Sequence, residues 1–348
     1  MRLAVLAQLC MLPLPALAQT LPAAPLDVAR PVTVTARQIA NFRSGEPGRR
    51  VFGRLEFRGG LVLTGDTSSF GGWSGITLEA DGRRFLAVSD EGAWMAGEIA
   101  YKGTAPAGIG NARIGPIVAL KGRALDKKRD LDAEAISLQS GTLTNGTVLL
   151  AFERNHRIGI FPVAGGNLGI PTQYLKLPAD ARRMKTNKGF ESVAMLAGGP
   201  LKGSIVAFSE RYPGDIASHT GWIWIKGEPQ RLSLVDIGDF EITDAASLPS
   251  GDLLILERRF RWTEGVKMRL RQIRADAIKP GAVLEGETLL EADLSSEIDN
   301  MEGLAVHRGP AGETVLTLIS DNNFNTFLQR NLLLQFTLAD APKAAGAR

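Results

Sequence analysis

Ten positions that recur along the chain hold most of the side chains that could do chemistry. Each copy of a repeated pattern has one such position just before an apolar run and one just after the next apolar run. The first set is Ser74, Glu134, Glu191, Asp244 and Glu302, and the second set is Asp90, Glu153, Glu210, Glu257 and Asp321. Carboxylates that gather closely repel one another unless a cation or basic side chain lies among them.

The elements that must position these acids form a repeat. Each copy reads as an acidic residue, an apolar strand, a Gly- or Pro-containing turn, a second apolar strand and a second acidic residue. The steps between copies are 60, 57, 53 and 58 residues, taken at Ile76, Ile136, Val193, Ala246 and Leu304. A period of about 50 residues with several short strands is typical of a β-propeller. Turns such as Asp81-Gly82 and Asn145-Gly146 agree, because they supply the positive φ of tight hairpins.

We therefore predict an all-β protein, a single β-propeller of five to six four-stranded blades. A strand within residues 55–63 would complete the last blade beside the strand signal at 332–338, so that N- and C-terminal strands close the ring. Closure removes the exposed sheet edges of an open array. In each blade the acids before the first strand and after the second would emerge at the same end. The prediction is a ring of nine carboxylates at one mouth of the channel.

The N-terminus has the pattern of a targeting segment. Arg2 precedes an apolar run, and Ala16-Leu17-Ala18 fits a small-x-small cleavage site, so we expect a signal peptide at 1–18. The run is too short for a membrane span, and an uncleaved anchor is the alternative. We predict a flexible leader at 19–31, the propeller domain at 32–340 and a disordered tail at 341–348. The expected location is periplasmic or secreted, with no membrane span in the mature chain.

Composition excludes several classes of function. The net charge is only +3, which gives no support for a nucleic-acid partner. Cys10 lies inside the predicted signal, so the mature chain would hold no thiolate for zinc or for nucleophilic attack. His156, His219 and His307 form no metal-spaced pair. Neither a Gly-x-Ser-x-Gly elbow nor a phosphate-binding glycine loop occurs.

The acids point to calcium, because Asp, Glu and Asn offer the oxygen ligands that this cation takes, about six to eight at a time. We expect Glu191, Glu302 and Glu210 to take part in catalysis. The predicted metal ligands are Asp90, Glu134, Glu153, Glu191, Asp244, Glu257, Glu302, Asp321 and Asn322. The alternative is a structural one, in which the acids cap blade ends and pair with the arginines that follow them.

Basic residues enter and leave the same predicted mouth. The expected substrate-binding set is Arg154, Arg183, Lys185, Lys188, Arg211 and Arg258. Cations beside metal-binding carboxylates suit a small anionic substrate such as a phosphate ester, with metal on some oxygens and Arg or Lys on the others. A solvated surface loop is the alternative explanation for such charges.

Five segments carry a resemblance to a known family. They are Gly71-Gly72-Trp73-Ser74-Gly75, Val88-Ser89-Asp90-Glu91-Gly92, Gly189-Phe190-Glu191, Leu254-Ile255-Leu256-Glu257-Arg258-Arg259-Phe260 and Ser320-Asp321-Asn322-Asn323-Phe324. Together they resemble the phytase-like family described as "esterase-like activity of phytase", over residues 55–338. The resemblance implies a secreted bacterial propeller related to calcium-dependent phytases, which hydrolyse phosphate esters of inositol. It also favours six blades.

The leading hypothesis is an exported, calcium-dependent hydrolase of phosphate esters acting at the channel mouth. One alternative is a non-catalytic propeller of the cell envelope that binds a ligand or a protein. The other is a calcium-dependent lactonase or carboxylesterase. Whether the chain is an enzyme stays open at the level of sequence.

Overall fold

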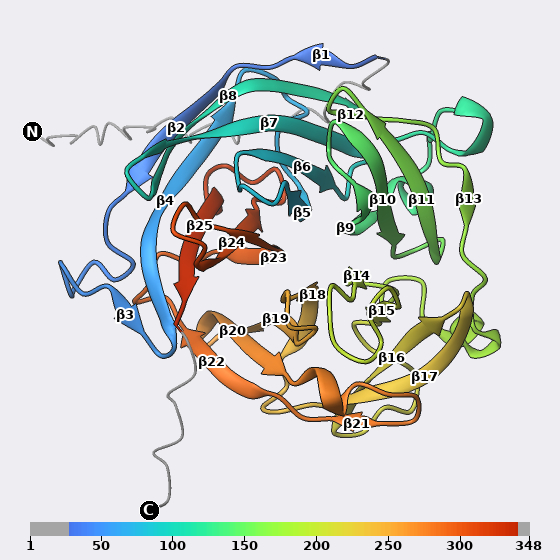
Figure 1. Ribbon diagram of the computed structural model, residues 1–348. Helices are drawn as coiled ribbons and strands as arrows, with labels where there is room; N and C mark the ends of the chain where they lie inside the picture. The colour runs from blue at the N-terminus through green and yellow to red at the C-terminus, as the bar shows by residue number, and fades with distance from the viewer. Residues whose placement is uncertain (1–27, 340–348) are drawn as a thin grey trace, which may run out of the picture.

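The computed structural model describes residues 28–339, which form five small β-sheets around a central axis (Figure 1). The chain passes from one sheet to the next, so the molecule is a five-bladed β-propeller and the predicted class is confirmed. A sixth blade is not formed, because residues 34–65 join the sheet of the C-terminal strands. The predicted signal peptide at 1–18, residues 19–27 of the leader and the tail at 341–348 lie outside the described residues.

Blades 1 and 2 contain the first two copies of the repeat. From the axis outward, blade 1 has β5 (Trp73–Leu78), β6 (Arg84–Ser89), β7 (Ala93–Lys102), β8 (Ala105–Pro116) and β1 (Arg30–Pro31). Blade 2 has β9 (Ala133–Gly141), β10 (Asn145–Phe152) and β11 (Arg157–Ala164), with β12 (Asn167–Leu168) and β13 (Gln173–Tyr174) on its outer edge. Gly82 has the predicted positive φ (71°), whereas in blade 2 Gly141 (72°) has it instead of Gly146.

Blades 3 and 4 follow the same order. Blade 3 has β14 (Ala194–Met195), β15 (Ile205–Phe208), β16 (Ser218–Ile225), β17 (Glu228–Val235) and β21 (Val283–Leu284), and β21 runs parallel to β17. Blade 4 has β18 (Glu241–Ser247), β19 (Leu253–Arg261), β20 (Gly265–Ile273) and β22 (Glu287–Ala292). Helical structure within 28–339 is limited to α1 (Lys128–Leu131) and short 3-10 turns at Leu120–Gly122, Ala179–Arg183 and Ala275–Ala277. None of these described helices is long and apolar enough to cross a membrane.

Blade 5 joins the two ends of the described chain. Its strands are β23 (Asn300–Arg308), β24 (Thr314–Asp321), β25 (Asn331–Leu338), β4 (Leu55–Gly65), β2 (Val34–Ile39) and β3 (Val51–Phe52). The N-terminal β4 pairs antiparallel with the C-terminal β25, from Leu55 opposite Leu338 to Leu63 opposite Asn331. This pairing confirms the predicted closure and leaves neither β4 nor β25 as a free edge.

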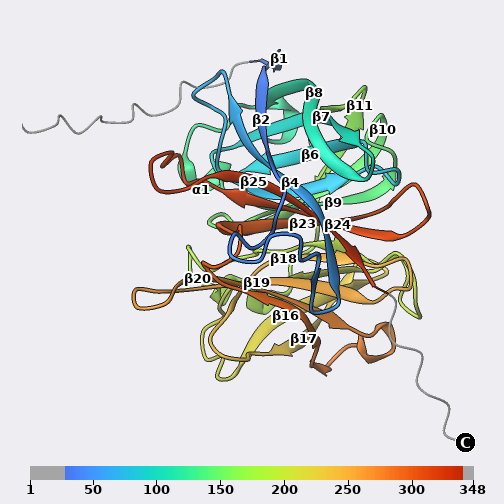
Figure 2. The same cartoon turned by 90° about the vertical axis from the view of Figure 1, so that its left-hand side faces the viewer.

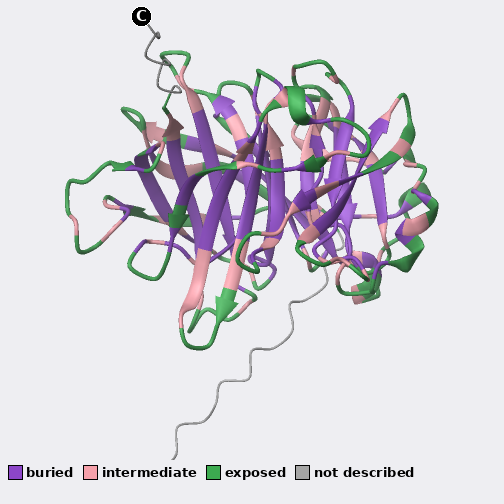
Figure 3. Ribbon diagram, turned by 90° about the horizontal axis from the view of Figure 1, so that it is seen from below, coloured by how far each residue is buried: buried purple, intermediate pink, exposed green. Residues whose placement is uncertain are grey.

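The innermost strands of neighbouring blades lie against one another around the axis. Small residues allow this approach: a Cβ on Gly75 would lie 3.0 Å from the Cα of Ala135, and a Cβ on Gly303 would lie 3.0 Å from the Cα of Gly75. Large side chains such as Trp222 and Phe57 are buried in the apolar clusters. The buried strands thus form a rigid frame, with exposed loops at its two ends (Figure 3).

Candidate functional site

One cavity of about 320 Å³ lies at the end of the axis where each blade's first strand begins. Eight of the ten predicted ring positions line it: Ser74, Asp90, Glu134, Glu153, Glu191, Glu210, Glu302 and Asp321. The other lining residues are Lys128, Asp132, Arg154, Asn187, Lys188, Arg258, Asn300 and Asn323. Acids that are scattered along the sequence therefore converge on one opening.

A β-bulge presents the inner-strand residue to this cavity. In blade 2, Ala133 pairs with Phe152 and Ala135 with Ala151, which leaves Glu134 as the extra residue. Blades 1 and 5 leave Ser74 and Glu302 unpaired by the same kind of register shift. Because a bulge re-aims a side chain out of the regular alternation, these residues point to the mouth instead of into the neighbouring blade.

The bulge in blade 4 is displaced by one residue relative to the acidic pattern. Ile242 pairs with Glu257 and Asp244 pairs with Leu256, so Thr243 is the extra residue. Thr243 and Arg258 therefore hold the positions that Glu134 and Glu153 hold in blade 2. The predicted ring of nine carboxylates is corrected to seven, since blade 4 contributes the cation Arg258 to the cavity and no acid.

The two acids of blade 4 are buried away from the cavity, each with its own partners. Asp244 accepts hydrogen bonds from the backbone N–H groups of Leu304 (2.7 Å) and Ala245 (2.8 Å), and its burial raises its pKa well above the ordinary value. Glu257 accepts hydrogen bonds from the buried Arg269 (2.7 Å) and Arg271 (2.9 Å). Asp244 links β18 to β23 of blade 5, and Glu257 links β19 to β20 within blade 4, so both acids stabilise the frame.

Two groups of three carboxylates in the cavity are close enough to share a cation. In each group, one oxygen per residue lies within 4.8 Å of the other two, and the groups are Asp132, Glu134, Glu153 and Glu153, Glu191, Glu210. Glu153 belongs to both groups. The cavity therefore contains two adjacent oxygen-donor sites joined by one carboxylate.

The electrostatics of these acids show that their charges are poorly compensated. Burial, followed by the neighbouring Asp132, raises the pKa of Glu153 to about 7. Burial and Glu241 raise the pKa of Glu210 to about 8. The pKa of Glu191 is raised well above its ordinary value by burial first and then by repulsion from several other acids. At neutral pH, a cation that enters this cavity would displace protons from carboxyl groups.

The part of the cavity beside blade 5 has the same character. Burial and the proximity of Asp90 raise the pKa of Asp321 to about 7. Burial also raises the pKa of Glu302, although Arg258 at 3.5 Å opposes the shift.

Basic side chains surround the acids without neutralising all of them. Lys128 of α1 contacts Asp90 (2.7 Å) and Asp132 (3.0 Å), and Arg154 contacts the other oxygen of Asp132 (2.8 Å). In the segment before β14 of blade 3, Lys188 donates to Glu210 (2.5 Å). The cavity thus offers both oxygen donors for a cation and N–H donors for an anion.

Other predicted substrate-binding and metal residues lie outside the cavity lining. Arg183 lies over the ring of Tyr212, 5.6 Å from its centroid, and Lys185 is exposed. The Oδ1 of Asn322 is taken up by the backbone N–H groups of Gly72 and Phe324. By contrast, the predicted Arg154, Lys188 and Arg258 do line the cavity.

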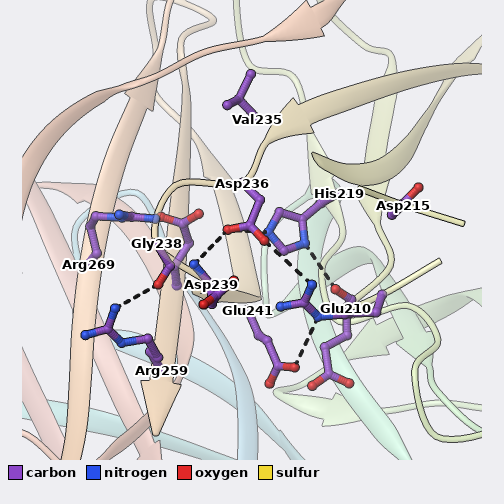
Figure 4. Close-up of polar contacts among 12 residues, drawn as sticks. Glu210, Asp215, His219, Val235, Asp236, Gly238, Asp239, Glu241, Arg259 and Arg269 are labelled. Carbon is purple, nitrogen blue, oxygen red and sulfur yellow. Dashed lines mark hydrogen bonds and ion pairs between the residues drawn. The ribbon is translucent and has the colours of Figure 1, made fainter. Parts of the chain in front are cut away.

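Arg211 belongs to a polar cluster behind Glu210. It reaches both Asp236 and Glu241, each at 3.6 Å. His219 is fully buried there, with Nδ1 3.1 Å from the carbonyl oxygen of Glu210 and Nε2 4.0 Å from Asp236 (Figure 4). This cluster holds the backbone at Glu210, so Arg211 supports the cavity wall from outside.

Asp132 and Lys128 are site residues that the sequence-based prediction missed. A signal for Asp132 was present, because residues two apart in an extended segment share a face and Asp132 is two residues before Glu134. Lys128 stood out only as one of three consecutive basic residues, and nothing in that run marks which one turns inward.

A comparison with known protein families identifies the family of the chain. Residues 68–324 match the model of a family named phytase-like and described as esterase-like activity of phytase. The chain belongs to the phytase-like family. The matched region contains every acid of the cavity, so the site is part of the phytase-like domain itself.

Two further comparisons complete this placement of the phytase-like chain. No curated protein matches it. Among solved structures, Raptor from Chaetomium thermophilum is similar with 10% sequence identity and a TM-score of 0.40 over 87% of this chain. The match covers 29% of the Raptor chain, so this protein spans less than a third of that structure's length.

Proposed function

We propose that this phytase-like protein is a calcium-dependent hydrolase of phosphate esters and that the reaction takes place in the mouth cavity. The observation that carries the proposal is the pair of carboxylate groups sharing Glu153, flanked by Lys128, Lys188 and Arg258 in one cavity. Carboxylates alone repel a phosphate ester, but carboxylates that hold a cation beside Lys and Arg attract one.

The donor set fits calcium. Every candidate ligand is an oxygen, which a hard cation prefers, and the residues that would hold it are Asp132, Glu134, Glu153, Glu191 and Glu210. The raised pKa values of Glu153 and Glu210 support the fit, because they show that the charged form of each carboxylate is destabilised in the absence of a cation. When bound, calcium would supply positive charge that polarises the phosphoryl group and offsets the charge developing on it.

The chain's own residues would bind the substrate and move a proton. Arg258 and Arg154 lie on different walls of the cavity, where their planar N–H groups would hold phosphoryl oxygens. Glu210 is a candidate acid–base group, because the N–H donor of Lys188 fixes its position at 2.5 Å. Glu191, which precedes β14 of blade 3, and Glu302 of blade 5 would complete the catalytic set.

Export is part of the proposal. Its support is the sequence pattern at residues 1–18, with cleavage after Ala18 and action in the periplasm or outside the cell.

The test is hydrolysis of a panel of phosphate monoesters, carboxylate esters and lactones by purified protein, with calcium or with a chelator. We expect phosphate release only with calcium, and a loss of about a hundredfold or more in Glu153→Gln. The matched control is Glu287→Gln, which changes an exposed acid on β22 and leaves the rate unchanged. Calcium should also raise the melting temperature of the wild type and not of Glu153→Gln.

Two outcomes would replace the proposal by its alternatives. Calcium-dependent cleavage of lactones or carboxylate esters with no phosphate release would assign the cavity to carboxylate chemistry. If no compound of the panel is hydrolysed while calcium still binds, the protein would be a non-catalytic binding propeller.

A further inference from the structure

Two loops beside the cavity expose large apolar side chains to solvent. The β19–β20 hairpin carries Phe260 and Trp262, whose rings are in contact (5.6 Å between centroids), and the side chain of Trp262 is 94% exposed. The loop from β24 to β25 carries Phe327 (93% exposed) and Leu328. Both loops project from the same end of the propeller as α1 (Figure 2). They lie at the mouth, since Arg258 of β19 and Asp321 of β24 line the cavity.

Exposed cations occupy other loops of the same end. Lys127 lies next to α1, and Arg182 and Lys185 precede Lys188, which lines the cavity. None of these three side chains forms an ion pair with another residue of the described range 28–339. The mouth thus combines a basic side with an aromatic side.

We propose that this mouth face docks on the surface of an anionic phospholipid bilayer. Trp262 and Phe327 would insert among the headgroups, while Lys127, Arg182 and Lys185 would face the lipid phosphates. Aromatic side chains, Trp above all, favour the boundary between water and hydrocarbon. Each Lys or Arg near an anionic leaflet adds further attraction.

The arrangement of the apolar residues favours a membrane over a protein partner. A stable protein interface needs a continuous complementary surface, roughly 800 Å² on each side. Here the two aromatic groups lie at the tips of separate loops, and exposed polar residues such as Thr326 and Thr263 stand beside them. Separate tips can each enter a fluid interface without a matching pocket. The inference holds whether or not the cavity hydrolyses phosphate esters.

The protein contains its own reporter for this contact. Of its five tryptophans, Trp262 alone is exposed; the others, Trp73, Trp94, Trp222 and Trp224, are at most 2% exposed. A change in tryptophan emission on adding vesicles would therefore report on Trp262. We expect a blue shift and protection from a soluble quencher with vesicles of phosphatidylcholine and phosphatidylglycerol. Vesicles of phosphatidylcholine alone should give a much weaker response.

Variants separate the two contributions in a vesicle co-sedimentation assay. Replacing both aromatic residues (Trp262→Ser with Phe327→Ser) should lower partitioning by about tenfold or more, because each ring loses its burial. Replacing all three cations (Lys127→Gln, Arg182→Gln and Lys185→Gln) should remove the preference for phosphatidylglycerol. Val51→Ser is the matched control, since Val51 is exposed at the other end of blade 5, where it pairs with Glu56 beside the end of β25.

Thermal melting will show that each variant is folded before its binding is compared. The proposal is overturned if the wild type binds neither kind of vesicle at low salt. It is equally overturned if the folded double aromatic variant binds as well as the wild type, or if the emission of Trp262 changes only on adding a protein.

Discussion

In blade 2 the bulged residue is Glu134 and the residue after the second strand is Glu153; in blade 4 the same two positions hold Thr243 and Arg258. Blade 2 thus presents two acids to the cavity, where burial and other acids raise their pKa values. Blade 4 keeps its acids one residue away, as partners of backbone N–H groups and arginines. A shift of one residue in register separates a carboxylate that lines the cavity from one that is buried against partners of its own.

The difference also breaks the symmetry of the mouth. Asp244 occupies the place of Gly75, Ala135 and Gly303 in the other inner strands, where neighbouring blades approach closely. It spans the gap between β18 and β23 with hydrogen bonds. The carboxylate groups that could hold a cation therefore cluster on blades 2 and 3, while Arg258 lies on the side of blades 4 and 5. Under the proposed function, a phosphoryl group held between them would have carboxylates on one side and a guanidinium group on the other.

The largest effect is expected from replacing Glu257, the acid that is paired with two buried arginines. Glu257→Gln leaves Arg269 and Arg271 buried without a counter-charge, so it should lower the free energy of unfolding by about 3–5 kcal/mol. Glu153→Gln, measured in calcium-free buffer at neutral pH, should leave the free energy of unfolding unchanged or raise it, because the substitution removes repulsion between carboxylates. Urea unfolding of both variants measures the contrast. If both variants lose the same free energy of unfolding, the proposed difference between the acids of blade 2 and blade 4 is wrong.

A smaller effect is expected at the gap between β18 and β23. Asp244→Ala leaves the buried N–H of Leu304 without an acceptor and should cost about 1–3 kcal/mol in unfolding free energy. Asp244→Asn, which keeps a hydrogen-bond acceptor, is the control, and its free energy of unfolding should fall by less. If Asp244→Ala melts at the wild-type temperature, the bridging role assigned to this carboxylate is wrong.

A pH dependence of the cation-free protein is expected from the acids that line the cavity. The folded-state pKa of Glu210 is about 8, against an ordinary value of 4.5, so the folded state binds more protons than the unfolded state within this window. Stability should therefore fall as pH rises from 4.5 to about 8. In chelator, Glu210→Gln should make the decline in melting temperature over this range clearly shallower. Scanning calorimetry across this range will decide, and an unchanged slope in Glu210→Gln would contradict the assignment.

The sequence alone was sufficient for the fold and for the convergence of the acids. The repeat at Ile76 and its equivalents predicted the blades, and the strand near Leu55 predicted the closure, because both follow from apolar periodicity and spacing. The register of blade 4 was not predictable, since a bulge adds one residue without changing the pattern of apolar residues around Asp244. Arg183, Lys185 and Arg211 lie outside the cavity lining, which the sequence did not reveal, because position in a loop does not fix the direction of a long side chain.

The pairing of β4 with β25 also has a consequence for how the molecule is made. Leu55 meets Leu338 only after nearly all of the described chain has been synthesised. Contacts between such distant residues form late and slowly. Until β25 has paired with β4, the edges of β24 and β4 are free to pair with another copy. Chaperone capture or aggregation during biosynthesis should act at this seam, and a chain cut short before β25 would keep it open permanently.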